Sequence, residues 1–237
     1  MVALVILPGM DGTAKPRADF VAALGPGIEA HVVSYPADHT GYSALEALAR
    51  ASLPQDRPYV LLGESFSGPI AISIAASSPP QLIGLVLCAT FACNPRPILG
   101  SLRWLLPLIP FGLAPMQLIG AFLLGRFASA PMLEAMRSTL TEVSMATLKA
   151  RTGAVLGVDV RHALSKVRVP ALYLRATEDR LVPRGCANAI ASAIAQTHIV
   201  DVEAPHFLLQ VAPDAAATAV RTFIEALSQG GEAGHIS

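Results

Sequence analysis

Short runs of apolar residues recur along the chain, and stretches with helical periodicity separate them. The runs are rich in Val, Ile and Leu and are bounded by turn residues, which is typical of strands buried in a parallel sheet. Because strands and helices alternate, the pattern predicts an α/β fold with a mostly parallel sheet of about six strands and helices on both faces. The strands are expected at residues 2–7, 31–35, 59–62, 82–89, 171–176 and 198–202.

Two helices have recognisable ends in the sequence. Ser43 followed by Glu46 has the form of a capping box, so a helix is expected to start there. Apolar residues recur at helical spacing from about Asp214, which predicts a last helix with one face on the sheet. Residues 229–237 are polar and rich in glycine, so we expect this tail to be frayed.

The alternation is interrupted between the strands at 82–89 and 171–176, where a simple crossover would need far fewer residues. The first half of this stretch is strongly apolar, and residues 131–151 have an amphipathic helical pattern. We therefore predict a helical lid at residues 92–165, inserted into one core domain. The core is expected to consist of residues 1–91 and 166–237.

Composition narrows the function classes. The chain has 53% apolar and 14% charged residues and a net charge of +0, so no field of one sign favours nucleic acid, and a neutral or small substrate fits better. Its three cysteines lack the spacing of metal ligands and are expected to be reduced, buried thiols. We expect neither a metal nor a cofactor.

The location of the protein is also an expectation from sequence. Residues 1–7 lack the basic start and cleavage site of a signal peptide, which favours the cytoplasm. Arg103 and several prolines divide the apolar residues 98–125 into pieces shorter than a bilayer span, so no transmembrane helix is expected. Transient membrane contact through the lid stays open, and the oligomeric state is unknown.

Ser65 lies on a sharp turn between a strand and a helix. A nucleophile on such a turn needs small neighbours two positions away on each side, and Gly63 and Ser67 are both small. Gly68 allows the helix to approach the strand closely, and Pro69 fits a first helical turn. The alternative is that Ser65 and Ser67 only cap the helix. The strand and helix on either side favour Ser65 as a nucleophile.

A serine nucleophile needs a base at the same edge of the sheet. His206 directly follows the last strand and precedes the final helix, so it can reach that edge. The alternative is a buried structural histidine. The other histidines open their strands or lie in polar, irregular surroundings; they are His31, His39, His162, His198 and His235.

The third expected group is a carboxylate that orients the imidazole. Asp179 lies in the loop after the strand at 171–176 and is our choice. Glu178 is an alternative, and Asp159 is a weaker one because it precedes the strand. Asp179 could also form only a turn or pair with Arg180.

An oxyanion formed at Ser65 would need backbone donors. One is expected from the residue after the nucleophile and one from a glycine-rich loop after the first strand. Phe66 supplies the first position. Met10, in the loop at residues 8–13, supplies the second.

The order serine, acid, histidine resembles that of the α/β-hydrolase family, and the resemblance covers nearly the whole chain. Residues 7–12, 63–68, 179–183 and 204–207 are similar to its oxyanion loop, nucleophile elbow, acid loop and base loop. The resemblance implies a reduced sheet that lacks the family's first two strands. A serine at the elbow, where some members have aspartate, argues against epoxide hydrolase or haloalkane dehalogenase chemistry.

This chain departs from the family pattern at two positions. Ser67 stands where the elbow usually has glycine, and Pro8 stands where a histidine often precedes the oxyanion-loop glycine. Neither departure removes a catalytic group.

These residues predict a serine hydrolase that cleaves a carboxylic ester or thioester with an apolar acyl group through an acyl-enzyme intermediate. Apolar lid residues would form the acyl pocket, although the same composition fits core packing. An acyltransferase that uses the same triad and a non-catalytic binding protein that kept the fold remain alternatives. The residues predicted for the pocket are Trp104, Leu105, Leu106, Ile109 and Phe111.

Overall fold

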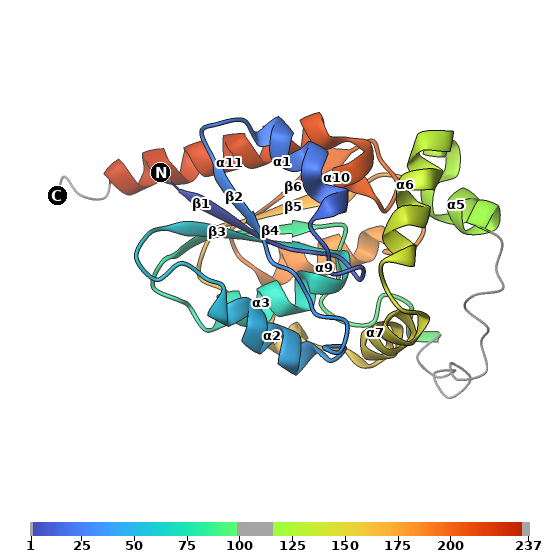
Figure 1. Ribbon diagram of the computed structural model, residues 1–237. Helices are drawn as coiled ribbons and strands as arrows, with labels where there is room; N and C mark the ends of the chain where they lie inside the picture. The colour runs from blue at the N-terminus through green and yellow to red at the C-terminus, as the bar shows by residue number, and fades with distance from the viewer. Residues whose placement is uncertain (1, 99–115, 234–237) are drawn as a thin grey trace.

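A single sheet of six parallel strands forms the centre of the protein, as predicted. The computed structural model describes residues 2–98 and 116–233 (Figure 1). The strands lie side by side in the order β2-β1-β3-β4-β5-β6, and every neighbouring pair is parallel. They are β1 (Ala3–Leu7), β2 (Glu29–Val32), β3 (Tyr59–Glu64), β4 (Leu82–Cys88), β5 (Ala171–Ala176) and β6 (Thr197–Val202).

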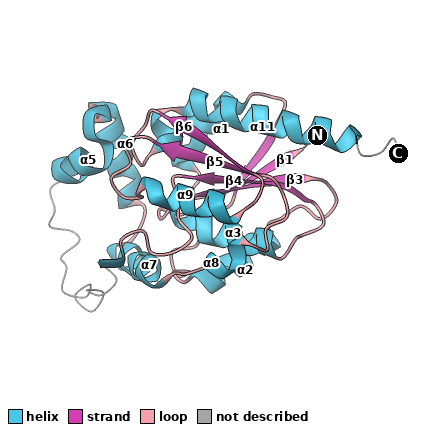
Figure 2. Cartoon of the chain, turned by 180° about the vertical axis from the view of Figure 1, so that it is seen from behind, coloured by secondary structure: helices cyan, strands magenta, loops and turns pink. Residues whose placement is uncertain are grey.

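Helices cover both faces of the sheet (Figures 1 and 2). Alternate residues of β1 enter different cores: Leu4 and Ile6 face one way, and Val5 and Leu7 face the other. Burial on both faces explains why the strands read as continuous apolar runs. The first core is closed by α1 (Ala18–Leu24), α10 (Leu208–Val211) and α11 (Pro213–Ala233). The second is closed by α2 (Tyr42–Ala51), α3 (Gly68–Ala76), α8 (Arg161–Leu164) and α9 (Arg184–Ala193).

The residues between β4 and β5, called here the β4–β5 segment, form several helices joined by loops where the structure describes them. Ser129 and Ser144 accept hydrogen bonds from backbone N–H groups and cap two of these helices. The segment's described helices before α8 lie beyond the carboxyl ends of the strands (Figure 1). Within this segment Cys93 and Asp159 pair in an antiparallel bridge. Its helices before α8 are α5 (Met116–Leu124), α6 (Ala130–Thr141) and α7 (Met145–Gly157).

The edge strand β2 differs from its predicted range of 31–35. It pairs only with β1, starting at the Ala3–Glu29 pair, and the chain leaves the ladder after Val32. Glu29 and His31 are exposed on this edge. A half-exposed strand lacks a continuous apolar run, so the sequence pattern predicted the start of β2 two residues too far along the chain.

Two predicted helix ends are wrong. The helix α2 begins at Tyr42 with Gly41 as its cap, and no side chain caps it. Glu46 instead forms an ion pair of 2.7 Å with Arg50, one turn further along the same helix. At the other end of the chain α11 continues to Ala233, past the predicted start of the frayed tail at 229, and the rest of that tail, residues 234–237, lies outside the described residues. A helix already packed on the sheet passes through glycines at a cost of about 1 kcal/mol each.

Two further expectations concern thiols and membranes. Cys88 is buried as expected, whereas Cys93 and Cys186 are partly exposed, and all three are free thiols. Among the helices described within residues 2–98 and 116–233, none combines the length and apolar character needed to cross a bilayer.

Candidate active site

Ser65 occupies a strained turn at the carboxyl end of β3. Its φ of 47° lies in the left-handed region, which non-glycine residues adopt at an energetic cost. A Cβ atom at Gly63 would lie 2.7 Å from the Cβ of Ala71, so only glycine fits there. A Cβ at Gly68 would collide with the side chain of Thr90, whose hydroxyl donates to the Ser65 carbonyl. Close packing on all sides therefore holds the turn in place.

Three side chains meet at this edge in a chain of hydrogen bonds. Ser65 Oγ lies 2.7 Å from His206 Nε2, and His206 Nδ1 lies 2.8 Å from Asp179 Oδ2. The second carboxylate oxygen accepts the backbone N–H groups of Leu181 at 2.8 Å and Val182 at 2.9 Å. These two bonds fix the orientation of the carboxylate. With Nδ1–H donating to Asp179, Nε2 is free to accept the proton of the serine hydroxyl.

The residues weighed against this set have other partners. Glu178 forms an ion pair with Arg126 at 2.6 Å, and Asp159 pairs with Arg161 at 2.5 Å. Arg180 donates to the Ala121 carbonyl and not to Asp179. The structure therefore brings Ser65, His206 and Asp179 together and leaves these alternatives outside.

The two predicted oxyanion donors, Met10 and Phe66, follow the carboxyl ends of the neighbouring strands β1 and β3. β1 and β3 are paired up to Leu7 and Gly63, so the loop after β1 starts beside the elbow. Phe66 follows Ser65 within a 3-10 turn, Ser65–Ser67, and its buried ring stacks on Tyr42 with centroids 4.8 Å apart. Met10 lies in the loop after β1. The roles of these two N–H groups stay a prediction.

A buried ion cluster, which the sequence analysis missed, joins the oxyanion loop to the elbow. The guanidinium of Arg17 is 2.5 Å from both Asp11 and Glu64, and only 2% of its side chain is exposed. Gln210 donates to the other oxygen of Glu64 at 3.0 Å. Burial alone would lower the pKa of Arg17, but the two carboxylates outweigh it and raise that pKa above its ordinary value. The sequence signal that could have indicated this cluster was an acidic residue inside each motif, Asp11 in the oxyanion loop and Glu64 in the nucleophile elbow.

The two departures from the family pattern touch each other. The Ser67 hydroxyl donates to the Pro8 carbonyl, and the Tyr35 hydroxyl lies 2.9 Å from Ser67 Oγ. Since Ser67 donates its only proton to Pro8, Tyr35 is the donor in the second bond. The extra hydroxyl at the elbow thus braces the start of the oxyanion loop.

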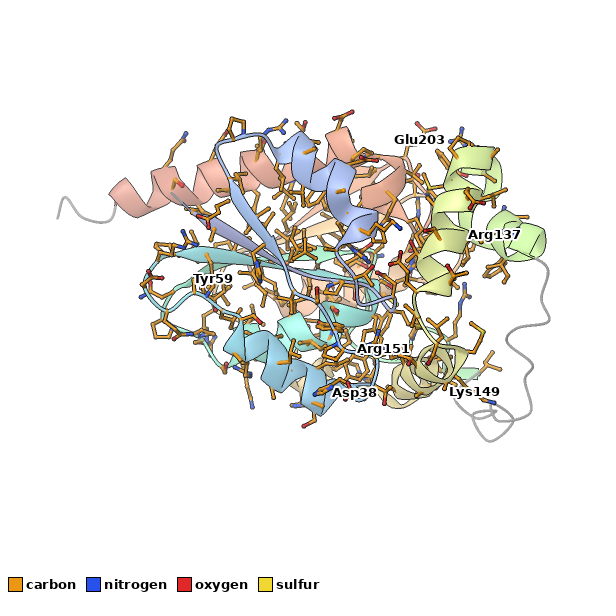
Figure 3. The ribbon with its side chains drawn as sticks, viewed as in Figure 1. Asp38, Tyr59, Arg137, Lys149, Arg151 and Glu203 are labelled. Carbon is orange, nitrogen blue, oxygen red and sulfur yellow. The ribbon has the colours of Figure 1, made fainter. Side chains whose placement is uncertain are left out.

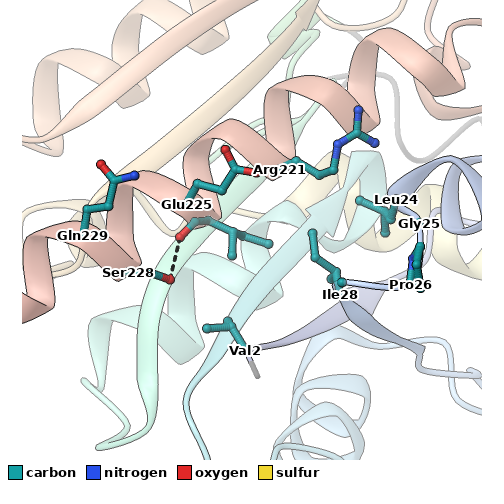
Figure 4. A pocket seen from close by; sticks show the side chains of 11 residues that line it. Val2, Leu24, Gly25, Pro26, Ile28, Arg221, Glu225, Ser228 and Gln229 are labelled. Carbon is teal, nitrogen blue, oxygen red and sulfur yellow. Dashed lines mark hydrogen bonds between the residues drawn. The ribbon is translucent and has the colours of Figure 1, made fainter.

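A pocket of about 750 Å³ opens elsewhere, between α11 and the loop that joins α1 to β2 (Figure 4). Val2 and Ile28 line it, so it lies at the amino ends of the strands, opposite the edge of Ser65. A smaller pocket of about 360 Å³ lies between α2 and α3. Neither pocket is lined by Ser65, Asp179 or His206. The five residues predicted for the acyl pocket lie outside the described residues; they are Trp104, Leu105, Leu106, Ile109 and Phe111.

Comparison with known proteins places this geometry in a family. The fold is similar to that of the enol-lactonase from Burkholderia xenovorans LB400, with a TM-score of 0.78, 18% identity, and coverage of 95% of this chain and 92% of that one. A hydrolase from Oleispira antarctica has a TM-score of 0.79 at 14% identity, with coverage of 95% and 91%. An esterase from Exiguobacterium antarcticum has a TM-score of 0.76 at 14% identity, with coverage of 95% and 92%.

At these identities the structural likeness establishes the fold. A search of curated protein sequences found no match. The family model described as "Alpha/beta hydrolase family" matches residues 4–219, which is most of the chain. The chain therefore belongs to the alpha/beta hydrolase family.

Proposed function

We propose that the protein is a serine hydrolase that cleaves a carboxylic ester or thioester with an apolar acyl group. The observation that carries the proposal is the chain of hydrogen bonds from Ser65 through His206 to Asp179, with distances of 2.7 and 2.8 Å. A weakly nucleophilic hydroxyl, a base within reach and a third group that orients the base are the requirements for covalent acyl transfer. Family membership supports a hydrolase in general.

The reaction would proceed in two steps. His206 Nε2 takes the proton of Ser65 Oγ as that oxygen bonds to the acyl carbon. The negative oxygen of the tetrahedral intermediate would be stabilised by the N–H groups of Met10 and Phe66. As the intermediate collapses, the bond to the leaving alcohol or thiol breaks and His206 gives it the proton. Water, activated by the same histidine, then releases the acid and restores Ser65.

The apolar acyl group is inferred from the surroundings of the oxyanion loop. Met10 and Tyr42 are partly buried against the same core as Ala154 and Val155 of α7. An apolar chain entering beside Met10 would find apolar side chains on both the core and the β4–β5 segment. The structural neighbours include an esterase and an enol-lactonase, and a lactone is a cyclic ester.

We also propose that residues 92–165 act as a lid. The helices α5, α6 and α7 lie beyond the same sheet edge as Ser65 (Figure 1). Arg126, between α5 and α6, forms ion pairs with Glu178 and Glu203, which flank the acid and base of the triad in the sequence. These contacts would connect any movement of the lid to the loops that carry Asp179 and His206.

The first experiment compares hydrolysis of p-nitrophenyl esters of increasing acyl length by the wild type and by Ser65→Ala. Loss of the nucleophile should lower kcat by at least about 10⁴-fold. Ser192→Ala, at an exposed position on α9, is the matched control and should keep wild-type activity. Equal activity of Ser65→Ala and the wild type would contradict the proposed nucleophile.

The remaining alternatives give different products. With an added alcohol, an acyltransferase forms a new ester at the expense of free acid, whereas a hydrolase forms mainly acid. A binding protein that only kept the fold would be inert toward every ester. It would also fail to react at Ser65 with a fluorophosphonate, which mass spectrometry of the intact chain detects.

A further inference from the structure

Arg151 is a fully buried arginine that α7 directs toward the oxyanion loop (Figure 3). Its Nη1 donates to the Met10 carbonyl at 2.8 Å. Its Nη2 donates to the carbonyls of Pro36 and His39, both at 3.0 Å. The guanidinium thus joins the β4–β5 segment to the loops that follow β1 and β2.

These bonds end on backbone carbonyl oxygens and not on a carboxylate. A buried cation is costly unless it is paired, and carbonyl dipoles offset only part of that cost. Burial accordingly lowers the pKa of Arg151, and the negative charge of Asp11 opposes this shift. A buried position of this kind ordinarily holds an apolar side chain. Here Arg151 instead places a positive charge against the oxyanion loop.

The packing leaves Arg151 little freedom. A Cβ atom at Gly12, two residues after Met10, would lie 2.7 Å from Arg151 Nη1. The hydroxyl of Thr152, the next residue of α7, lies 3.6 Å from the Met10 sulfur. The helix α7 therefore contacts both the backbone and the side chain of Met10.

We propose that Arg151 is a positioning residue for the oxyanion of the hydrolysis, acting through Met10. It holds the Met10 carbonyl, and through it the backbone of the residue whose N–H is proposed to face the oxyanion, and it adds a buried positive charge on the Met10 side of the oxyanion loop. The inference rests on the proposed function. Because negative charge develops only during the reaction, Arg151 stabilises the transition state more than bound substrate.

The test compares three variants of the full chain on the best p-nitrophenyl ester. Arg151→Lys keeps the charge, Arg151→Gln keeps a neutral donor, and Arg151→Met keeps neither. We expect kcat to fall by about 10- to 100-fold in Arg151→Met, with KM changed by less than about threefold, because the effect on the oxyanion is indirect. The lysine variant should retain more activity than the glutamine variant. Arg168→Met, at an exposed position ahead of β5 and outside the proposed lid, is the control and should behave as wild type.

A second measurement separates positioning from structural support. An alkyl trifluoromethyl ketone adds to a catalytic serine and forms an oxyanion, whereas the matching methyl ketone binds largely without doing so. Inhibition by the trifluoromethyl ketone should weaken by the same factor as kcat/KM, while binding of the methyl ketone stays unchanged. Parallel weakening of both ketones, or a rise in KM at constant kcat, would overturn the inference.

Two results would distinguish this inference from the proposed function. If the wild type hydrolyses esters in a Ser65-dependent manner but the variants keep wild-type kcat, only the role of Arg151 is wrong. If the wild type is inert on every ester, both proposals fall. Thermal unfolding of each variant identifies a folding defect; if Arg151→Met does not fold, the order of kcat between Arg151→Lys and Arg151→Gln decides.

Discussion

The loop after β1, the proposed oxyanion loop, is held from two sides by two buried arginines with different partners. On the core side, Arg17 meets the carboxylates of Asp11 and Glu64. On the side of the β4–β5 segment, Arg151 meets the carbonyls of Met10, Pro36 and His39. The core side is thus an ion cluster that stabilises the fold at the elbow, whereas the other side leaves a cation with no carboxylate in hydrogen-bond contact. Two buried arginines can therefore have different roles.

The largest expected effect comes from removing the core-side cation. Arg17→Met would leave the buried Glu64 and the largely buried Asp11 without their partner and should lower the free energy of unfolding by about 3–5 kcal/mol at pH 7. Urea unfolding followed by circular dichroism measures the loss. Adding Glu64→Gln and Asp11→Asn should recover part of it, because neutral groups are less costly to bury.

The control for this change is an exposed pair. Arg57 and Glu29 form an ion pair at 2.6 Å on the surface, and Arg57→Met should change stability little because such pairs are screened by solvent. If Arg17→Met costs no more than Arg57→Met, the ion cluster does not hold the elbow.

A smaller effect is expected at the brace between the elbow and the loop. Ser67→Ala would leave the Pro8 carbonyl and the Tyr35 hydroxyl unpaired and should cost about 1–3 kcal/mol in the free energy of unfolding. Tyr35→Phe removes only a donor, since Ser67 still reaches Pro8, and should cost about 0.5–1.5 kcal/mol. Chemical unfolding of both variants gives the order. A larger loss for Tyr35→Phe would contradict the bonding assigned to Ser67.

The smallest of these effects is the acid dependence, and it should distinguish the two sides of the loop. Burial raises the pKa of Asp11, but Arg17 outweighs this and lowers it below its ordinary value. A carboxyl group with a lowered folded-state pKa stabilises the fold above its unfolded pKa, and that contribution is lost as the pH falls through the folded value. Stability should therefore decline below about pH 4.

Asp11→Asn should flatten that decline, whereas Arg151→Gln should retain it, because the contacts that lower the pKa of Asp11 come from Arg17 and Thr13. Urea midpoints measured between about pH 3 and pH 6, at intervals of about 0.5 pH units, would give the slope of stability against pH for each variant. An equal slope in Asp11→Asn and the wild type would show that other carboxyl groups account for the acid dependence.

The sheet and the triad were accessible from sequence for a common reason. Parallel strands bring their carboxyl ends to one edge, so residues directly after strands meet even when they are far apart in sequence. Ser65 and His206 follow β3 and β6 in this way, and Asp179 follows β5. Local rules were weaker at exposed elements, as the bounds of β2 and the missing cap at Ser43 show.

The two arginines could not be found in the same way. Arg17 reaches Glu64 and Arg151 reaches Met10 across long separations in sequence, and no periodicity marks either arginine as buried. Both lie in stretches where a basic residue is normally a solvated one. Their roles depend on tertiary packing that composition and spacing do not encode.

The bridge between Cys93 and Asp159 has a consequence for the modularity of this protein. Opposite Cα atoms in an antiparallel pair lie about 4.5–5.5 Å apart, so the part of the β4–β5 segment between Cys93 and Asp159 departs and returns at nearly one point. Grafts from relatives can therefore exchange the segment without altering the course of β4 or β5. A graft that brings no cation to the place of Arg151 would inherit the scaffold but leave the carbonyls of Met10, Pro36 and His39 without their shared donor.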